Sequence, residues 1–111
     1  MTITVKFVTN DDNHPPGKLA DAELHFTGGD LDGLKLIGFA IWERRVGGGR
    51  NVTFPARSYS VNGERRSFAL LRPTASEAGT NGQDRVRELV LAAYAEYENR
   101  DVAGIAAQVG L

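Results

Sequence analysis

The residues best suited to acid–base or metal chemistry are the two histidines, His14 and His25, because the chain has no cysteine. His14 follows Asp11 and Asp12 in a turn-forming stretch, where aspartate more often stabilises the turn than binds a metal. His25 lies on the polar side of a predicted strand, and no G-x-S-x-G turn supplies a nucleophile. We therefore expect no catalytic residues, no metal site and no enzymatic activity. A small enzyme built on His25 and neighbouring carboxylates is kept as a third hypothesis.

Two further motifs lack the spacing that their chemistry needs. Asp30-Leu31-Asp32-Gly33 is similar to the start of an EF-hand calcium loop, but Ile41 stands where that loop needs a bidentate glutamate. The three glycines at 47–49 are followed neither by a lysine and a serine or threonine nor by a helix, so they do not form a phosphate loop. We expect no cofactor and identify no small-molecule substrate.

Arginine is distributed unevenly along the chain. The formal net charge at pH 7 is −1, yet residues 40–72 hold seven arginines against two glutamates, a local charge of +5. Guanidinium groups bind phosphates through two hydrogen bonds and stack on bases, so this segment is a candidate for nucleic-acid binding, although charge alone favours a solvated surface. A solvated hairpin surface is the alternative. The seven are Arg44, Arg45, Arg50, Arg57, Arg65, Arg66 and Arg72.

Three aromatic residues lie within the same part of the chain: Trp42, Tyr59 and Phe68. Their rings are of the kind on which unpaired bases stack. Trp42 and Phe68 are more readily interpreted as core residues, because large aromatic side chains usually bury most of their surface.

Alternating apolar and polar residues predict six short strands, with Asn62-Gly63 as a strong hairpin turn. Leu34–Trp42 is apolar on both faces, which predicts a central strand or one covered by a helix or a second subunit. Strict alternation places Leu36 and Phe39 on opposite faces of this strand. The predicted strands are Ile3–Thr9, Lys18–Phe26, Leu34–Trp42, Asn51–Phe54, Arg57–Val61 and Arg65–Leu71.

A loop or short helical turn over Thr74–Asn81 is predicted to lead into a C-terminal helix with Asn81 as its N-cap. Apolar residues at helical spacing form one stripe, flanked near its start by Arg85 and Arg87. Asp101–Leu111 has similar spacing and predicts a short second helix. The stripe consists of Val86, Leu89, Val90, Ala93, Tyr94 and Tyr97.

Together these patterns predict an α+β fold: an antiparallel β-sheet of about five to six strands followed by a C-terminal amphipathic helix, with residues 1–111 as a single domain. The first residues lack the basic and apolar regions of a signal peptide, and the longest apolar run is too short to span a bilayer. We therefore expect a cytoplasmic protein with no membrane partner.

Three segments carry a resemblance to a known family: Asn-Val-Thr-Phe-Pro-Ala-Arg at 51–57, Ser-Phe-Ala-Leu-Leu-Arg-Pro at 67–73 and Val-Arg-Glu-Leu-Val-Leu-Ala-Ala-Tyr at 86–94. Over about residues 18–97 the chain resembles the stage V sporulation protein G (SpoVG) family of bacterial regulators. In that family one strand ends in Pro-Ser-Lys/Arg, a later strand in His-Pro and a helix in Val-Leu-x-x-Tyr. The residues that fit are Pro55, Arg57, Pro73, Val90, Leu91 and Tyr94.

The resemblance implies a small mixed domain that dimerises through its sheet and binds DNA or RNA. Family members carry a basic pair around the first turn of the helix, and here Arg85 matches one position of the pair while Gln83 stands at the other. Arg72 stands where the family has a histidine before the second proline. Our leading hypothesis is a homodimeric SpoVG-like regulator. A protein–protein interaction module without nucleic-acid binding is the alternative, indicated by the doubly apolar Leu34–Trp42. The nucleic-acid-binding residues would be Arg57, Arg72, Arg85 and Arg87, with a further contact from the hairpin that holds Arg44, Arg45 and Arg50.

Overall fold

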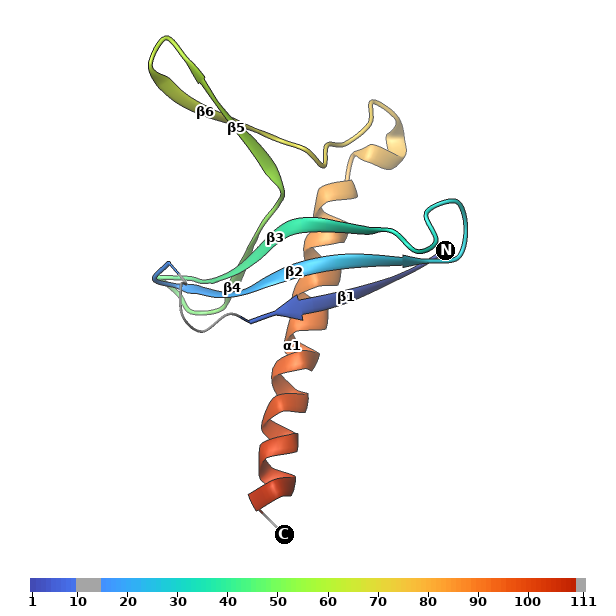
Figure 1. Ribbon diagram of the computed structural model, residues 1–111, viewed down its shortest axis with the longest axis vertical. Helices are drawn as coiled ribbons and strands as arrows, with labels where there is room; N and C mark the ends of the chain where they lie inside the picture. Colours follow the sequence, from blue (N-terminus) through green and yellow to red (C-terminus); the bar gives the residue numbers. More distant parts are fainter. Residues whose placement is uncertain (10–14, 110–111) are drawn as a thin grey trace.

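A computed structural model describes residues 1–9 and 15–109 of the protein and, for residues 101–109, the backbone path alone. Six strands precede a long C-terminal helix, which confirms the expected α+β class (Figure 1). The turn expected around His14 lies outside the described residues. The elements are β1 (Thr2–Val8), β2 (Lys18–Thr27), β3 (Lys35–Glu43), β4 (Arg50–Thr53), β5 (Ala56–Val61), β6 (Glu64–Ala69), a one-turn 3-10 helix η1 (Glu77–Gly79) and α1 (Gly82–Val109).

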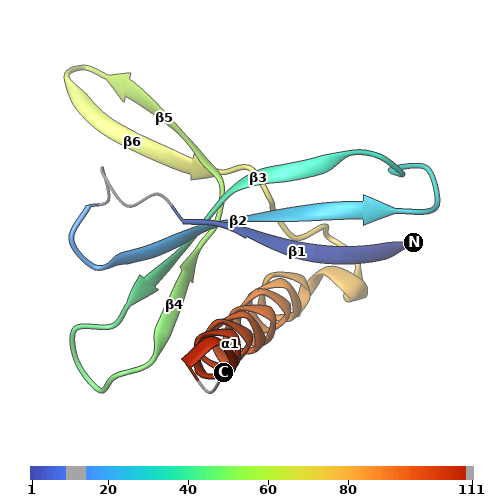
Figure 2. The same cartoon turned by 60° about the horizontal axis from the view of Figure 1, so that its bottom comes forward.

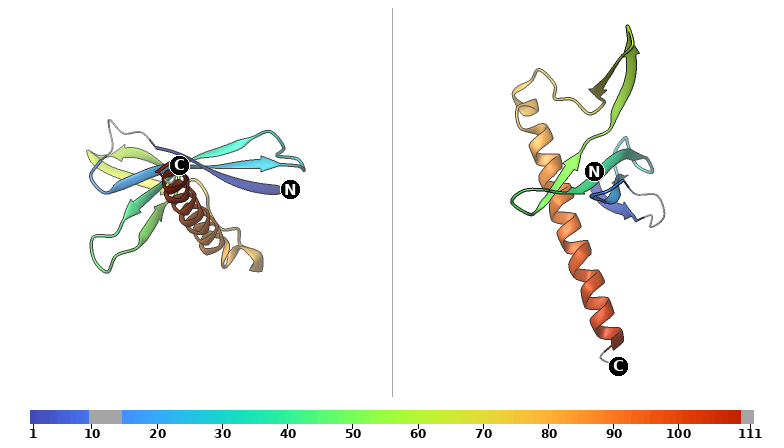
Figure 3. Two further views of the ribbon diagram at one scale, coloured as in Figure 1. Left: turned by 90° about the horizontal axis from the view of Figure 1, so that it is seen from below. Right: turned by 90° about the vertical axis from the view of Figure 1, so that its left-hand side faces the viewer.

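The strands form two antiparallel sheets of different size. β1, β2, β3 and β4 pair in chain order as a four-stranded meander, and β5 pairs with β6 in a separate hairpin. Figures 1 and 3 show this hairpin projecting away from the larger sheet and from the helix. We call the four-stranded sheet with α1 the body, and residues 56–69 the arm.

The core of the body lies between α1 and one face of the larger sheet (Figure 2). Successive residues of a strand point to opposite faces, so Ala22 and Leu24 of β2 are both buried toward the helix. Val90 and Tyr94 are four residues apart on α1 and are buried against this face. At the sheet edge, the ring centroid of Phe7 lies 5.2 Å from that of Tyr94.

The helix differs from its prediction in two respects. It runs continuously to Val109, so residues 101–109 continue α1 instead of forming the second helix expected over 101–111, of which 110–111 lie outside the described residues. Leu89 was expected in the apolar stripe but is exposed, and Leu91 packs against the core instead, because the buried line of α1 is centred on Val90. No helix in the described residues is both long and apolar enough to cross a membrane.

β3 departs from strict alternation at Gly38. Ala22 pairs with Phe39, whereas Leu24 pairs with Leu36, so β3 contains one extra residue and forms a bulge. Gly38 has a φ of 109°, a conformation that L side chains rarely adopt. Leu36 and Phe39 therefore both pack into the core, and the expectation that they lie on opposite faces is wrong.

The bulge also fixes how the chain leaves the body for the arm. A Cβ atom added to Gly38 would lie 2.8 Å from Cβ of Pro55, which is buried directly before β5. Glycine is therefore needed at 38 both for its φ and for the close approach of Pro55. Pro55 accepts a hydrogen bond at its carbonyl oxygen from the amide of Leu70, 2.9 Å away, and this bond closes the base of the arm.

Candidate nucleic-acid interface

The turn of the arm fixes its register. Asn62 and Gly63 both have positive φ, 52° and 80°, as a two-residue type I′ turn requires. This turn pairs Val61 with Glu64, and the ladder continues without a shift to the base of the arm. Residues that pair directly lie on the same face, so the sequence of the two strands determines the composition of each face.

One face of the arm combines arginine with aromatic rings. Arg57 pairs with Phe68, and Tyr59 pairs with Arg66, so the two rings lie on one diagonal and the two guanidinium groups on the other. The ring centroids of Tyr59 and Phe68 are 5.7 Å apart. We call these four residues the checkerboard face. The opposite face of the arm carries Ser58, Ser60, Arg65 and Ser67.

The two rings are accessible to solvent: Tyr59 is 40% exposed and Phe68 is 43% exposed. The interpretation of Phe68 as a core residue is therefore wrong, because no residue of the arm belongs to the hydrophobic core or packs against it. Trp42, interpreted in the same way, is half-buried, and its Nε1–H donates a hydrogen bond to Oγ1 of Thr53 over 2.9 Å.

The arginines of the arm are weakly engaged within the protein. In the described part of the chain, Arg57 and Arg65 have no carboxylate partner. Nη2 of Arg66 lies 3.2 Å from Oε2 of Glu64, but both side chains are mostly exposed. Such surface pairs contribute little to stability and are screened by salt, so these guanidinium groups are available to another anion.

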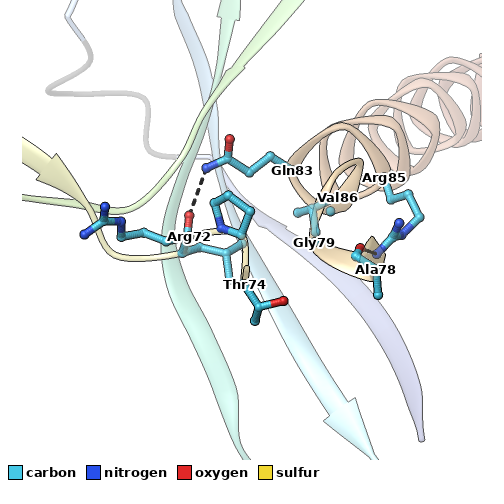
Figure 4. Close-up of a pocket in the computed structure, with 10 residues that line it drawn as sticks. Arg72, Thr74, Ala78, Gly79, Gln83, Arg85 and Val86 are labelled. Atoms are coloured by element: carbon cyan, nitrogen blue, oxygen red, sulfur yellow. Dashed lines mark hydrogen bonds between the residues drawn. The ribbon is translucent and has the colours of Figure 1, made fainter. Parts of the chain in front are cut away.

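The segment that follows the arm is held to the start of α1. Nε2 of Gln83 donates a hydrogen bond to the carbonyl oxygen of Leu71 over 3.1 Å (Figure 4). Gln83 thus anchors this segment to the helix. A cavity of about 350 Å³ lies between the segment and the helix, lined in part by Arg72, Gly79 and Val86.

Arg72 and Arg85, both predicted to bind nucleic acid, line this cavity, whereas Arg87 does not. In Figure 4 the side chain of Arg72 points away from the helix. The side chain of Arg85 folds back, and its Nη2 donates a hydrogen bond to the carbonyl oxygen of Ala78 over 3.1 Å. Nη1 of Arg87 lies 2.8 Å from Oδ1 of Asp84. Of the three, Arg72 alone has no hydrogen-bond or ion-pair partner in the described residues.

The arginines near the glycine-rich loop also divide into two kinds. Arg44 and Arg45 are exposed in the connection from β3 to β4. Arg50 begins β4, and its Nη2 lies 3.1 Å from Oε2 of Glu98 on α1. This hydrogen bond raises the pKa of Arg50 above its ordinary value, and Nε of Arg50 is buried without a hydrogen-bond partner in the described part of the chain. Arg50 therefore links sheet and helix rather than forming part of a flexible contact.

His25 belongs to a surface ion-pair network. Its Nε2 lies 3.0 Å from Oε1 of Glu23, and Nζ of Lys35 lies 3.3 Å from the same oxygen. The hydrogen bond with His25 is the largest cause that lowers the pKa of Glu23, and Lys35 adds to it. Within the described residues, no group of three or more His, Cys, Asp or Glu side chains is placed to hold a metal ion.

The acidic turn after β2 has a structural role. Oδ1 of Asp32 accepts a hydrogen bond from the backbone amide of Gly28 over 2.7 Å, which closes the turn between β2 and β3. Side-chain acceptance of this kind is typical of aspartate in turns. Turn formation therefore explains the segment Asp30-Leu31-Asp32-Gly33, whose sequence is similar to the start of a calcium loop.

Searches against protein-family models, curated proteins and solved structures find no match for this chain. The candidate interface therefore rests on the geometry of the arm and of the segment after it. The sequence predicts Tyr59 as a candidate ring for base stacking. Arg65 and Arg66 are not among the arginines predicted to bind nucleic acid. A two-residue turn at Asn62-Gly63 already implies that Tyr59 lies opposite Arg66, so the signal was present in the register.

Proposed function

We propose that this protein binds nucleic acid through arginines of the arm and of the segment that follows it. The observation that carries the proposal is the state of Arg57, Arg65 and Arg72. All three are exposed, and none has a carboxylate partner in the described residues. A guanidinium group that no carboxylate occupies is free to bind phosphate through two hydrogen bonds.

The resemblance of about residues 18–97 to the SpoVG family supports the same function, that of a small regulator that binds DNA or RNA. It also leads us to propose a homodimer. Leu34 and Ile37 of the β2–β3 region are 58% and 59% exposed, and the symmetric dimer that we propose would cover them. Arg85 and Arg87 are engaged within the protein and would contribute less than Arg57 and Arg72.

The test is a titration of labelled DNA and RNA with the protein at low and rising salt. We expect affinity to fall steeply with salt, because each phosphate contact releases condensed counterions. The combined change Arg57→Ala, Arg65→Ala and Arg72→Ala should weaken binding and reduce the salt slope by about one unit for each phosphate that is no longer bound.

A matched control removes the same number of charges elsewhere. Lys18, Lys35 and Arg100 lie within 4.0 Å of Asp21, Glu23 and Glu96 respectively, as the pairs at 2.7, 3.3 and 3.0 Å show. Changing these three residues to alanine should leave binding nearly unchanged. A wild-type protein that binds neither DNA nor RNA at low salt would contradict the proposal.

The second candidate function is a protein–protein interaction module without a nucleic-acid role. The exposed side chains of Leu34 and Ile37 favour it. If it is correct, the change of both residues to serine should abolish self-association in analytical ultracentrifugation, and the arginine variant should retain it. Both candidates predict this loss of self-association, so nucleic-acid binding by the wild-type protein separates them: the first candidate requires it and the second excludes it.

A further inference from the structure

The checkerboard face indicates which form of nucleic acid the arm would bind, and this inference rests on the proposed function. Arg57 and Tyr59 alternate along β5, and Arg66 and Phe68 alternate along β6. The antiparallel register places an arginine directly across from each ring. Neighbouring positions on one face of a sheet are close enough for one extended strand of nucleic acid to contact all four side chains.

The position of the rings is unusual for structural aromatics. They contact each other, with centroids 5.7 Å apart and planes inclined at 57°, but the arm makes no contact with the hydrophobic core. An isolated two-stranded hairpin is at best marginally stable in water, and a single ring pair contributes about 0.5–1.5 kcal/mol beyond area burial. The ring pair therefore helps to stabilise the arm, and it does so while both rings stay accessible to solvent, because no element of the described residues covers them.

The same face of the arm also carries positive charge. Arg57 has no carboxylate partner in the described residues, and the only partner of Arg66 there is Glu64, which is 71% exposed. Rings and guanidinium groups side by side match the two chemical parts of a nucleotide, the flat base and the phosphate. The opposite face, with three serines and Arg65, has no aromatic surface.

The accessible rings favour single strands over duplexes. In a duplex the flat faces of the bases are stacked on one another, so side chains reach the base edges and the phosphates alone. In a single strand the base faces are available to aromatic side chains. We infer that the checkerboard face binds single-stranded nucleic acid, with unpaired bases stacked on Tyr59 and Phe68 and phosphates bound by Arg57 and Arg66.

The test compares an oligothymidylate, an oligouridylate and a duplex of the same length by fluorescence anisotropy, using the full chain. The wild-type protein should bind a single strand more tightly than the duplex. Tighter binding of oligouridylate than of oligothymidylate would assign the site to RNA, and the reverse to DNA. Changing Tyr59 and Phe68 together to leucine keeps an apolar surface but removes the rings. It should weaken single-strand binding about 5- to 150-fold for each base that no longer stacks on a ring.

Two matched controls separate the faces of the arm. Tyr59→Phe keeps the ring and should retain single-strand binding. Arg65 and Arg66 are adjacent and carry the same charge, but their side chains lie on opposite faces. Arg65→Ala removes a charge of the proposed nucleic-acid surface and should weaken single-strand and duplex binding alike, whereas Arg66→Ala should weaken single-strand binding more than duplex binding. Unchanged circular dichroism and thermal midpoints would show that these variants fold, as expected for changes outside the core.

The outcomes distinguish this inference from the proposed function. Tighter binding of the duplex than of either single strand would overturn the inference while leaving nucleic-acid binding intact. The inference would also fail if the variant with leucine at positions 59 and 68 bound single strands as tightly as the wild type. It would fail as well if this variant were a monomer and the wild type a dimer, because the rings would then be covered by the partner subunit. No binding of any of the three probes by the wild-type protein would overturn both.

Discussion

The four-stranded sheet and the arm are both antiparallel and are joined through Pro55, yet only the sheet has a helix packed against it. In the sheet, the apolar side of each strand is buried under α1. In the arm, the corresponding residues face solvent. Phe39 is 0% exposed in the sheet, and Phe68 is 43% exposed in the arm. The same residue type therefore stabilises the fold in one region and is free to bind a ligand in the other.

The body and the arm also differ in how cooperatively they unfold. The body shares one hydrophobic core, so a change anywhere in it should affect global unfolding. The arm is attached through its base and has no part in that core, so it should open locally without unfolding the body. Changes of the same type made in each region test this difference directly.

The largest difference is expected between Phe39→Ala and Phe68→Ala. Removing the buried ring of Phe39 should lower the free energy of unfolding by about 3–5 kcal/mol, because apolar burial is reduced and a cavity is left behind. Phe68→Ala should change it by about 0.5 kcal/mol or less, as at other exposed sites. Urea denaturation of both variants measures the two values. Comparable losses would show that a second copy or another element covers the arm in solution.

A smaller difference is expected between Gly38→Ala and Gly63→Ala. Both glycines have positive φ, 109° and 80°, which costs an L residue about 1–2 kcal/mol. At Gly38 the new methyl group would also meet Pro55, whereas nothing lies within 4 Å at Gly63. Gly38→Ala should therefore lower the global free energy of unfolding by about 2 kcal/mol or more. Gly63→Ala should act within the arm alone.

Native-state amide exchange separates these two effects. In the Gly63→Ala variant, amides of β5 and β6 should exchange faster while those of β2 and β3 keep the wild-type rate. Faster exchange throughout the body in this variant would mean that the arm and the body unfold together, contrary to the comparison.

The smallest difference is expected between two ion pairs. Glu98 on α1 pairs with Arg50 of β4, whose Nε is buried, and Glu64 pairs with Arg66 within the arm. Glu98→Gln should lower the free energy of unfolding by about 1 kcal/mol at most, because the pair is partly exposed. Glu64→Gln should leave the thermal midpoint unchanged. An equal shift in both variants would remove this distinction between the regions.

Much of the fold could be predicted from local sequence. All six strands occur close to the predicted ranges, because alternation and turn residues act within a few residues of one another. The pairing of β2 with β3 could not be predicted in this way. Gly38 permits the bulge, but the close approach of Pro55, seventeen positions further along the chain, explains why it is required there.

The candidate site shows the same division. The positive charge of the candidate site follows from the arginines of residues 40–72 in the sequence. The sequence does not show which of these arginines pair with carboxylates in the folded protein. Arg50 and Arg87 have the same residue type as Arg57 and Arg72, yet carboxylates on α1 engage only the first two. The pair of Arg87 with Asp84 follows from their spacing of three residues within α1. The pair of Arg50 with Glu98 joins distant segments and depends on how the helix packs on the sheet, which local sequence does not specify.

The sequence by itself determined the composition of each face of the arm. The turn at Asn62-Gly63 sets the register, and the register places Tyr59 and Phe68 among arginines. Only the tertiary structure decided that this face is exposed. Burial depends on whether another element packs against a surface, and the single long helix covers the four-stranded sheet and leaves the arm uncovered (Figure 1).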